Sequence, residues 1–243
     1  SLPHNYLTTD IVLSKTISQV QTTLSYNLSY IKPFKKFQRI TSDELENLTN
    51  ILLKTEFQHT LALGAAWKWF NFKVYYTHYK SPIFETMSSI KSYNGPDYNS
   101  IGLQAIASYK KSFWSSSLSL YLHKQWLNME TVDGTNNLKK PRLITMFVNT
   151  FALPWGITLD LTANWETRGA KGSIMNYTNY FNMDASLYKE LYNGKLSIML
   201  TGENILGTAC IDATRYTPVS TKECGGDKKH LPTSVILSLK VQL

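Results

Sequence analysis

Apolar and polar residues alternate along most of this chain, and this period of two constrains the fold more than any other feature. The clearest case lies between Asn182 and Gly207, where two alternating segments flank Asn193-Gly194. Asn-Gly favours a type I′ turn, whose two central residues both need positive φ. One face would carry Met183, Ala185, Leu187, Leu196, Ile198 and Leu200. The segment therefore predicts a β-hairpin with one apolar face.

The same alternation recurs along the chain and predicts an all-β antiparallel up-and-down meander of about eleven strands. The expected strands lie around residues 9–14, 20–30, 57–67, 72–78, 101–109, 114–122, 144–148, 157–165, 182–191, 196–201 and 235–243. Between Lys32 and Lys54 the period is lost, and a capping box at Thr41 to Glu44 predicts a short amphipathic helix inside a long loop. Residues 1–243 are expected to form one β-barrel domain.

The connections between the predicted strands alternate between tight and long. They are tight near residues 16, 69, 111, 155 and 193 and long between those points. Because consecutive antiparallel strands place alternate turns at opposite ends, all tight turns fall at one end. Bacterial outer-membrane barrels have this asymmetry, with short periplasmic turns and longer extracellular loops.

Aromatic residues gather beside the tight turns, where the partly apolar and partly polar rings of Tyr and Trp would suit a membrane interface. The expected periplasmic girdle consists of Trp67, Trp69, Phe70, Tyr109, Phe113, Trp114, Trp155 and Tyr192. Tyr30, Trp126, Trp165 and Tyr177 lie at the other strand ends, and His59 and His78 are expected at the interface. A soluble sandwich or lipocalin-like barrel shows the same alternation, so that alternative stays open.

Polar side chains on the opposite strand faces suit a water-filled lumen. The lumen-facing candidates are Tyr121, His123, Asp160, Asn164, Glu166 and Asp184. Eleven is an odd number, whereas single-chain bacterial outer-membrane barrels have an even number of strands. The chain is therefore expected to be part of a larger barrel whose missing strands are N-terminal.

Residues Phe181 to Gly207, with their strand, Asn-Gly-Lys turn, strand and Asn-Ile-Leu ending, resemble the β-barrel of Bacteroidetes-type TonB-dependent receptors, often labelled outer-membrane β-barrel family proteins. Asn149 to Gly156 and Leu237 to Leu243 add to the similarity. The resemblance implies a barrel of about 22 strands in the bacterial outer membrane, with this chain as its C-terminal half. The N-terminal plug and TonB box of that family are absent from these residues.

The resemblance also implies a function and partners. The expected function is uptake of a nutrient, such as a glycan, a peptide or a metal chelate, driven through TonB by way of the missing N-terminal region. The expected partners are outer-membrane lipid or lipopolysaccharide, TonB and a surface lipoprotein. A plugless porin or structural barrel is the first alternative, and a secreted soluble β-sandwich or barrel that binds a ligand is the second.

Other classes find little support in the residues. The net charge of +8 is scattered over candidate loops, so nucleic acid is not an expected partner. The longest apolar run, around Leu61 to Trp67, is far shorter than the roughly 18 residues of a spanning helix. No catalytic or phosphate-binding motif occurs, so neither an enzyme, a cofactor nor a metal site is expected. Cys210 and Cys224 are a candidate disulfide within one loop, in an oxidising compartment.

Overall fold

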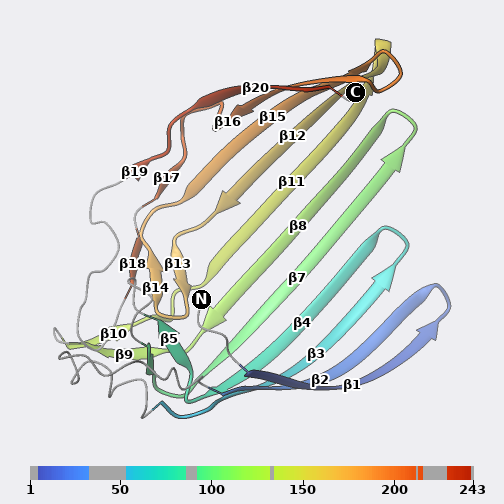
Figure 1. Cartoon of the computed structure of the whole chain (residues 1–243). Helices are drawn as coiled ribbons and strands as arrows, with labels where there is room; N and C mark the ends of the chain where they lie inside the picture. The colour runs from blue at the N-terminus through green and yellow to red at the C-terminus, as the bar shows by residue number, and fades with distance from the viewer. Residues whose placement is uncertain are drawn as a thin grey trace.

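Eleven long strands form one antiparallel sheet whose spatial order follows the chain (Figure 1). The computed structural model describes residues 5–32, 53–85, 92–131, 134–211, 213–215 and 229–241. The long strands are β1 Asn5–Ile17, β2 Val20–Lys32, β3 Glu56–Trp67, β4 Phe70–Lys80, β7 Tyr98–Lys111, β8 Trp114–Gln125, β11 Arg142–Leu153, β12 Ile157–Glu166, β15 Tyr180–Leu191, β16 Leu196–Glu203 and β20 Ser234–Val241. The predicted all-β meander is confirmed, whereas the predicted helix after Thr41 lies outside the described residues.

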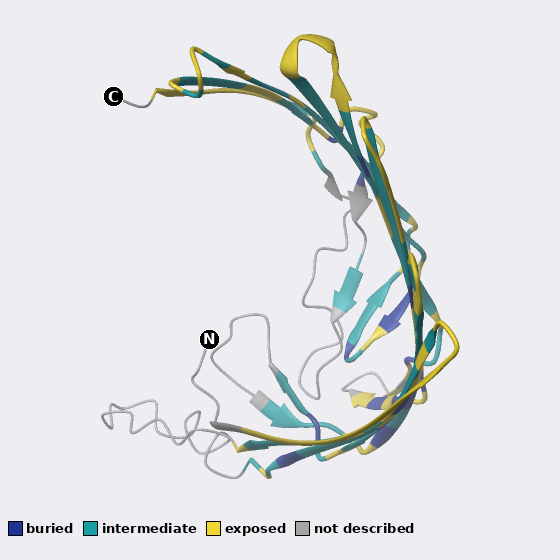
Figure 2. Ribbon diagram, turned by 90° about the vertical axis from the view of Figure 1, so that its right-hand side faces the viewer, coloured by how far each residue is buried: buried dark blue, intermediate teal, exposed yellow. Residues whose placement is uncertain are grey.

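Short strands occupy the long connections, at the end of the sheet opposite the tight turns. β5 Ile83–Glu85 pairs with β6 Ser92–Asn94, β9 Asn128–Thr131 pairs with β10 Gly134–Asn137, and β17 Cys210–Ile211 pairs with β19 Lys229–His230; β13 Gly169–Lys171, β14 Ile174–Asn176 and β18 Ala213–Arg215 form a small sheet. The large sheet curves into an open arc, and the short strands lie on its concave side (Figure 2). Among the described residues no helix is long and apolar enough to cross a membrane.

Four of the five tight turns use residues with positive φ, which gives them the twist that suits adjacent antiparallel strands. Ser18 and Lys68 take left-handed φ values of 56° and 46°, and a 3-10 turn at Pro154–Gly156 has Trp155 at 63°. The Asn193-Gly194 turn is wider than predicted. Tyr192 also has positive φ, and Leu191 and Leu196 form the last strand pair, so four residues make the turn instead of two.

Directly opposed residues on antiparallel strands share a face, so the register identifies both faces of the sheet. One apolar row runs through Leu24, Leu63, Val74, Leu103, Leu122 and Leu143, and it lies on the convex face. A row on the concave face, three residues nearer the long connections, contains Thr60, Thr77, Ser100 and Gln125. Leu63 is 60% exposed, so in this chain the apolar face has no protein layer against it.

The buried hydrophobic cluster instead lies at the long-loop end, on the concave side. Leu127, Met129 and Leu138 come from the connection that holds β9 and β10, and Ala170 comes from β13. Tyr98 comes from β7 of the large sheet, which is called the wall below. Leu127 and Ala170 are fully buried. The long connections therefore pack against the inside of the wall as an ordered layer.

Gly102 provides space for an aromatic ring on the concave face. A Cβ atom at this position would lie 2.1 Å from Cζ of Tyr75, on the neighbouring strand β4. The Tyr75 ring thus covers the glycine, and its hydroxyl donates a 2.6 Å hydrogen bond to the hydroxyl of Tyr121. A tyrosine over a strand glycine restores the packing that the glycine lacks.

We expect Gly102→Ala to lower the free energy of unfolding by about 1–3 kcal/mol, because the Tyr75 ring must move and its hydrogen bond to Tyr121 is strained. Gly64→Ala is the matched control on the same face, since a Cβ there would meet nothing closer than the carbonyl oxygen of Phe72 at 3.5 Å. Urea unfolding midpoints of the full-length protein in detergent measure both effects. Equal midpoints for the two variants would contradict this account.

Candidate functional site: the concave wall and its inserted hairpin

Charge divides sharply between the two faces of the eleven long strands. By register, all of their carboxylates lie on the concave face: Asp10, Glu56, Asp160, Glu166, Asp184, Glu190 and Glu203. Lysine is the only charged residue on the convex face of these strands. The lysines are Lys15, Lys32 and Lys80, with Lys111, Lys124 and Lys189. Each is near a strand end, so the middle of the convex face is uncharged.

The register also places all six polar candidates on the concave face. Tyr121 and His123 lie on β8, Asp160, Asn164 and Glu166 lie on β12, and Asp184 lies on the neighbouring strand β15. Tyr121, His123 and Glu166 come together around one inserted element, the hairpin of β13 and β14. The other three lie elsewhere along the wall.

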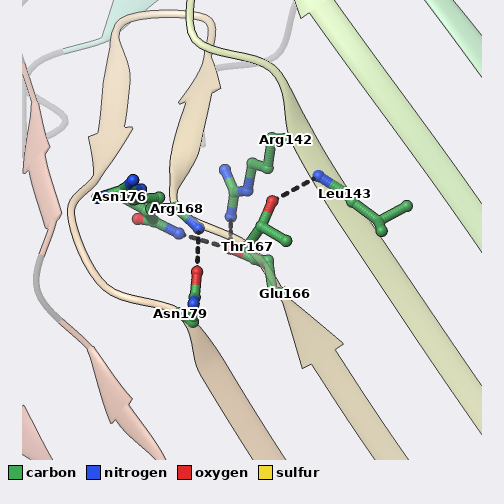
Figure 3. Close-up of polar contacts among 7 residues, drawn as sticks. All are labelled: Arg142, Leu143, Glu166, Thr167, Arg168, Asn176 and Asn179. Carbon is green, nitrogen blue, oxygen red and sulfur yellow. Dashed lines mark hydrogen bonds and ion pairs between the residues drawn. The ribbon is translucent and has the colours of Figure 1, made fainter.

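Glu166 connects the wall to the hairpin (Figure 3). Its Oε1 atom forms an ion pair with Nη2 of Arg142 on β11 and accepts a 2.5 Å hydrogen bond from the side-chain amide of Asn176 on β14. The Arg142 and Glu166 side chains are only 16% and 18% exposed. Such partly buried charged hydrogen bonds are stronger than exposed ones because water competes less for the groups. The carboxylate therefore holds β14 against the wall.

Gln125 forms the second attachment, at the tip of the hairpin. Its side-chain amide donates to the carbonyl oxygen of Gly172 and accepts from the Gly172 N–H, both at 2.8 Å. Gln125 is fully buried, and Gly172 has a left-handed φ of 57°. At the base, a Cβ on Gly169 would lie 2.3 Å from the carbonyl oxygen of Pro141. The hairpin thus lies flush against the wall at both ends.

A row of rings continues from this attachment along the concave face. The rings of Tyr75 and Tyr121 lie 6.3 Å apart, and the Tyr121 and His123 rings are nearly parallel at 6.1 Å. The Lys171 ammonium, from the hairpin, is 5.5 Å from the centre of the Tyr121 ring. His123 is 5% exposed and its Nε2 lies 3.3 Å from Oε1 of Gln125. The wall here offers aromatic faces beside one cation.

Further along the wall, Asp160 and Asp184 bind neighbours within the sheet or its loops. Asp160 accepts a 2.5 Å hydrogen bond from Thr150 on β11. Asp184 accepts hydrogen bonds from the Asn182 side chain and from the backbone N–H of Asn204, the latter at 2.8 Å.

Nearer the tight turns the wall has small side chains. A hollow of about 280 Å³ there is lined by Ser108, Lys110, Ser115 and Ser117 with others.

Four site residues were missed by the sequence analysis: Tyr75, Gln125, Arg142 and Lys171. Strand alternation alone could have found Tyr75 and Gln125, which continue the concave faces of β4 and β8. Nothing comparable marks Lys171, because it lies in a connection without a period of two. Its place depends on how the hairpin docks.

The aromatic residues predicted for the girdle all lie at the tight-turn end. Rings of Trp67 and Trp69 lie 6.2 Å apart, and those of Tyr109 and Trp114 lie 5.3 Å apart. Trp155 and Tyr192 are 84% and 76% exposed. The structure thus brings this set to one end of the sheet, with several large rings in contact across strands.

The described residues also bear on metal binding and on the predicted disulfide. Within the described part of the chain, no group of three or more His, Cys, Asp or Glu side chains could hold a metal ion. Cys210 belongs to β17, whereas Cys224 lies outside the described residues. The disulfide therefore stays a prediction.

We expect Glu166→Gln to release the hairpin, because it removes the counter-charge of the Arg142 guanidinium. A hydrogen bond to a charged group contributes about 1.5–3 kcal/mol to stability. Hydrogen exchange of the amides in 169–176 should become on the order of tenfold faster. Asp160→Asn is the control, since that carboxylate lies on the same strand face but binds Thr150 within the sheet. Unchanged exchange in the Gln variant would show that Glu166 does not hold the hairpin.

Solved structures share this architecture. The ferric-catecholate import receptor Fiu from E. coli K12, in its closed form, aligns with a TM-score of 0.60 at 14% identity over 96% of this chain and 34% of that chain. The FrpB iron transporter from Neisseria meningitidis (F3-3 variant) aligns with a TM-score of 0.57 at 10% identity over 96% of this chain and 44% of that one. This chain spans less than half the length of either protein. At these identities the likeness concerns the fold alone.

Sequence comparison identifies the family more directly. No curated protein matches the sequence significantly. The family model described as the outer membrane protein beta-barrel family matches residues 10–223, which is most of the chain. A convex face whose middle is uncharged, a polar concave face and the end-to-end difference in loop length are the features of such a wall. The chain therefore belongs to the outer membrane protein β-barrel family and is an outer-membrane protein.

Proposed function

We propose that this chain forms part of the wall of a receptor that takes up a nutrient through the lumen of a larger barrel. The division between a convex face that is uncharged along its middle and a concave face that holds every carboxylate of the eleven long strands supports this function most directly. A wall between lipid and a water-filled passage needs this division. The inserted hairpin, held by Glu166 and Gln125, would narrow the passage.

The proposed larger barrel follows from strand direction. β1 and β20 both run toward the tight-turn end, because β1 precedes the first tight turn and β20 pairs antiparallel with β16, which leaves the last one. These two edges cannot pair antiparallel with each other. We propose that an odd number of further strands closes the sheet, giving about 22 strands, with this chain as the C-terminal half.

We also propose an orientation for the sheet in the membrane and partners for the protein. The tight-turn end would face the periplasm, with its aromatic set at the inner interface, and the long connections would face the outside. The nutrient would be a glycan, a peptide or a metal chelate, and both structural neighbours carry names that refer to iron. TonB, acting on a region outside this chain, would supply energy, and a surface lipoprotein would assist capture. The chain would have no enzymatic role.

Of the two alternative functions, one is excluded and the other is not. The soluble secreted β-protein is wrong, because the chain belongs to an outer-membrane family. A plugless porin or structural barrel shares the same wall and differs in its need for energy, so an uptake experiment separates it from the receptor.

We expect uptake by the full-length protein to require the proton-motive force. Cells that express it, and cells from which its gene is deleted, are given a labelled oligosaccharide, a labelled peptide or a ferric catecholate chelate as probes. The receptor predicts gene-dependent accumulation of at least one probe, abolished by a protonophore. Gene-dependent entry that the protonophore leaves unchanged would instead identify a porin.

We expect Leu103→Arg to destabilise the barrel by about 2–4 kcal/mol, since Leu103 lies midway along the convex face and the charge would enter hydrocarbon. Gln104→Arg, one residue further along β7, places the same side chain on the concave face and should be nearly neutral. Unfolding of both variants in lipid bilayers measures the difference. A larger cost for Gln104→Arg would reverse the proposed orientation of the wall.

A further inference from the structure

Two polar atoms beside the inserted hairpin are buried and have no hydrogen-bond partner among the described residues. They are Nδ1 of His123 on β8 and Nε of Arg142 on β11. The two residues are directly opposed in the sheet, so their side chains are neighbours on the concave face. His123 is only 5% exposed. An unpaired polar atom in such surroundings costs free energy, which favours a ligand that satisfies both atoms at once.

The neighbouring glutamine fixes which nitrogen of the His123 ring carries a proton. The amide nitrogen of Gln125 donates to the carbonyl oxygen of Gly172, and its Oε1 accepts from the Gly172 N–H. Because Oε1 can only accept, the contact at 3.3 Å between Oε1 and Nε2 of His123 requires a proton on Nε2. The neutral ring therefore presents a bare Nδ1, and a further proton on His123 must bind at that atom.

Positive charge surrounds Nδ1 from two other strands. Arg142 directs Nη2 to Glu166, and its Nε–H has no such partner among the described residues. Lys171 lies on β13, with its ammonium 5.5 Å from the centre of the Tyr121 ring that stacks on His123. The charges of both Lys171 and Arg142 act on the His123 ring. Two cations here face one carboxylate, so a proton on His123 is opposed unless an anion enters with it.

We propose that His123, Arg142 and Lys171 form a binding site for a small monovalent anion of the size of chloride, which binds together with a proton on Nδ1 of His123. The proton turns Nδ1 into a donor, so the anion accepts from Nδ1–H, from Nε–H of Arg142 and from the Lys171 ammonium. The occupant is small because adjacent strands are about 4.8 Å apart. On the other side of His123, the Tyr75 ring covers Gly102, which is directly opposed to the histidine.

Such a site would link the docking of the hairpin to pH and to the anion. Without an anion, a proton on His123 adds a third positive charge beside Arg142 and Lys171 and pushes the hairpin away from the wall. With the anion bound, the same proton helps to hold Lys171 against the wall. Because one proton enters with each anion, the affinity for chloride should rise as the pH falls, by up to about tenfold per pH unit. The inference concerns how the hairpin is held, so it does not rest on the proposed uptake of a nutrient.

The test is hydrogen exchange of residues 169–176 in the full-length protein in neutral detergent, expressed as protection factors. Equal concentrations of sodium chloride and sodium gluconate are compared at about pH 5.5 and about pH 8, on either side of the usual titration of histidine. At the lower pH, chloride should raise the protection on the order of tenfold over gluconate, whose anion is too large for the site. At the higher pH the two salts should give equal protection. Residues 128–131 serve as an internal reference that neither salt changes.

Lys171→Gln removes one of the three donors at an exposed position, so the variant should fold and lose most of the chloride effect. Lys195→Gln is the matched control, since it removes an exposed lysine from the tight turn at the opposite end of the sheet and should respond as the wild type does. His123→Gln should show no chloride effect at either pH. Heat-dependent gel mobility verifies that each variant is folded.

Three outcomes would overturn the proposal. Equal protection in chloride and gluconate at the lower pH would mean that water alone satisfies the two buried atoms. A chloride effect of the same size at both pH values would show that no proton accompanies the anion. An unchanged chloride effect in Lys171→Gln would place the anion elsewhere on the protein.

Discussion

Every other feature of this structure depends on backbone hydrogen bonding within an uninterrupted antiparallel ladder. In hydrocarbon no water can satisfy a backbone N–H or C=O group, so each strand must be paired along its length. From β1 to β20 the pairing continues without a change of face, and each strand joins the next long strand in sequence. The unbroken register keeps carboxylates on one side and leaves lysines at the strand ends of the other. A one-residue slip would exchange the two faces.

The wall itself is stabilised differently from its loops. A thin sheet has no interior, and its apolar side chains gain their free energy from the surroundings instead of from a protein core. Among the described residues, a buried hydrophobic cluster forms where the connections fold inward, around Leu127, Met129 and Leu138. There, buried polar anchors such as Gln125 and Glu166 position loops that the ladder cannot hold. The wall gives rigidity, and the anchored loops shape the concave surface.

The sequence predicts the wall well because period two and turn spacing are local signals, and all eleven strands follow from them. The width of the Asn193-Gly194 turn was wrong by two residues, since Tyr192 takes a positive φ that its type does not favour. The anchors are harder to predict. Gln125 and Gly172 meet across 47 residues of sequence, in connections with no periodicity, and their contact depends on packing in three dimensions. All six polar candidates lie on the concave face, but only Tyr121, His123 and Glu166 gather at the hairpin.

The attachment of Gln125 to Gly172 has a consequence for how such loops diversify. Gln125 recognises only the main chain of the hairpin tip, through one N–H and one carbonyl group. Side chains on either side of the glycine, Lys171 among them, contribute nothing to that pair of bonds. Substitutions there can therefore alter the chemistry of the concave surface while the tip stays docked, provided that a residue tolerant of left-handed φ remains at 172. The fold thus separates the main-chain attachment of the hairpin from the side chains that form the concave surface around it.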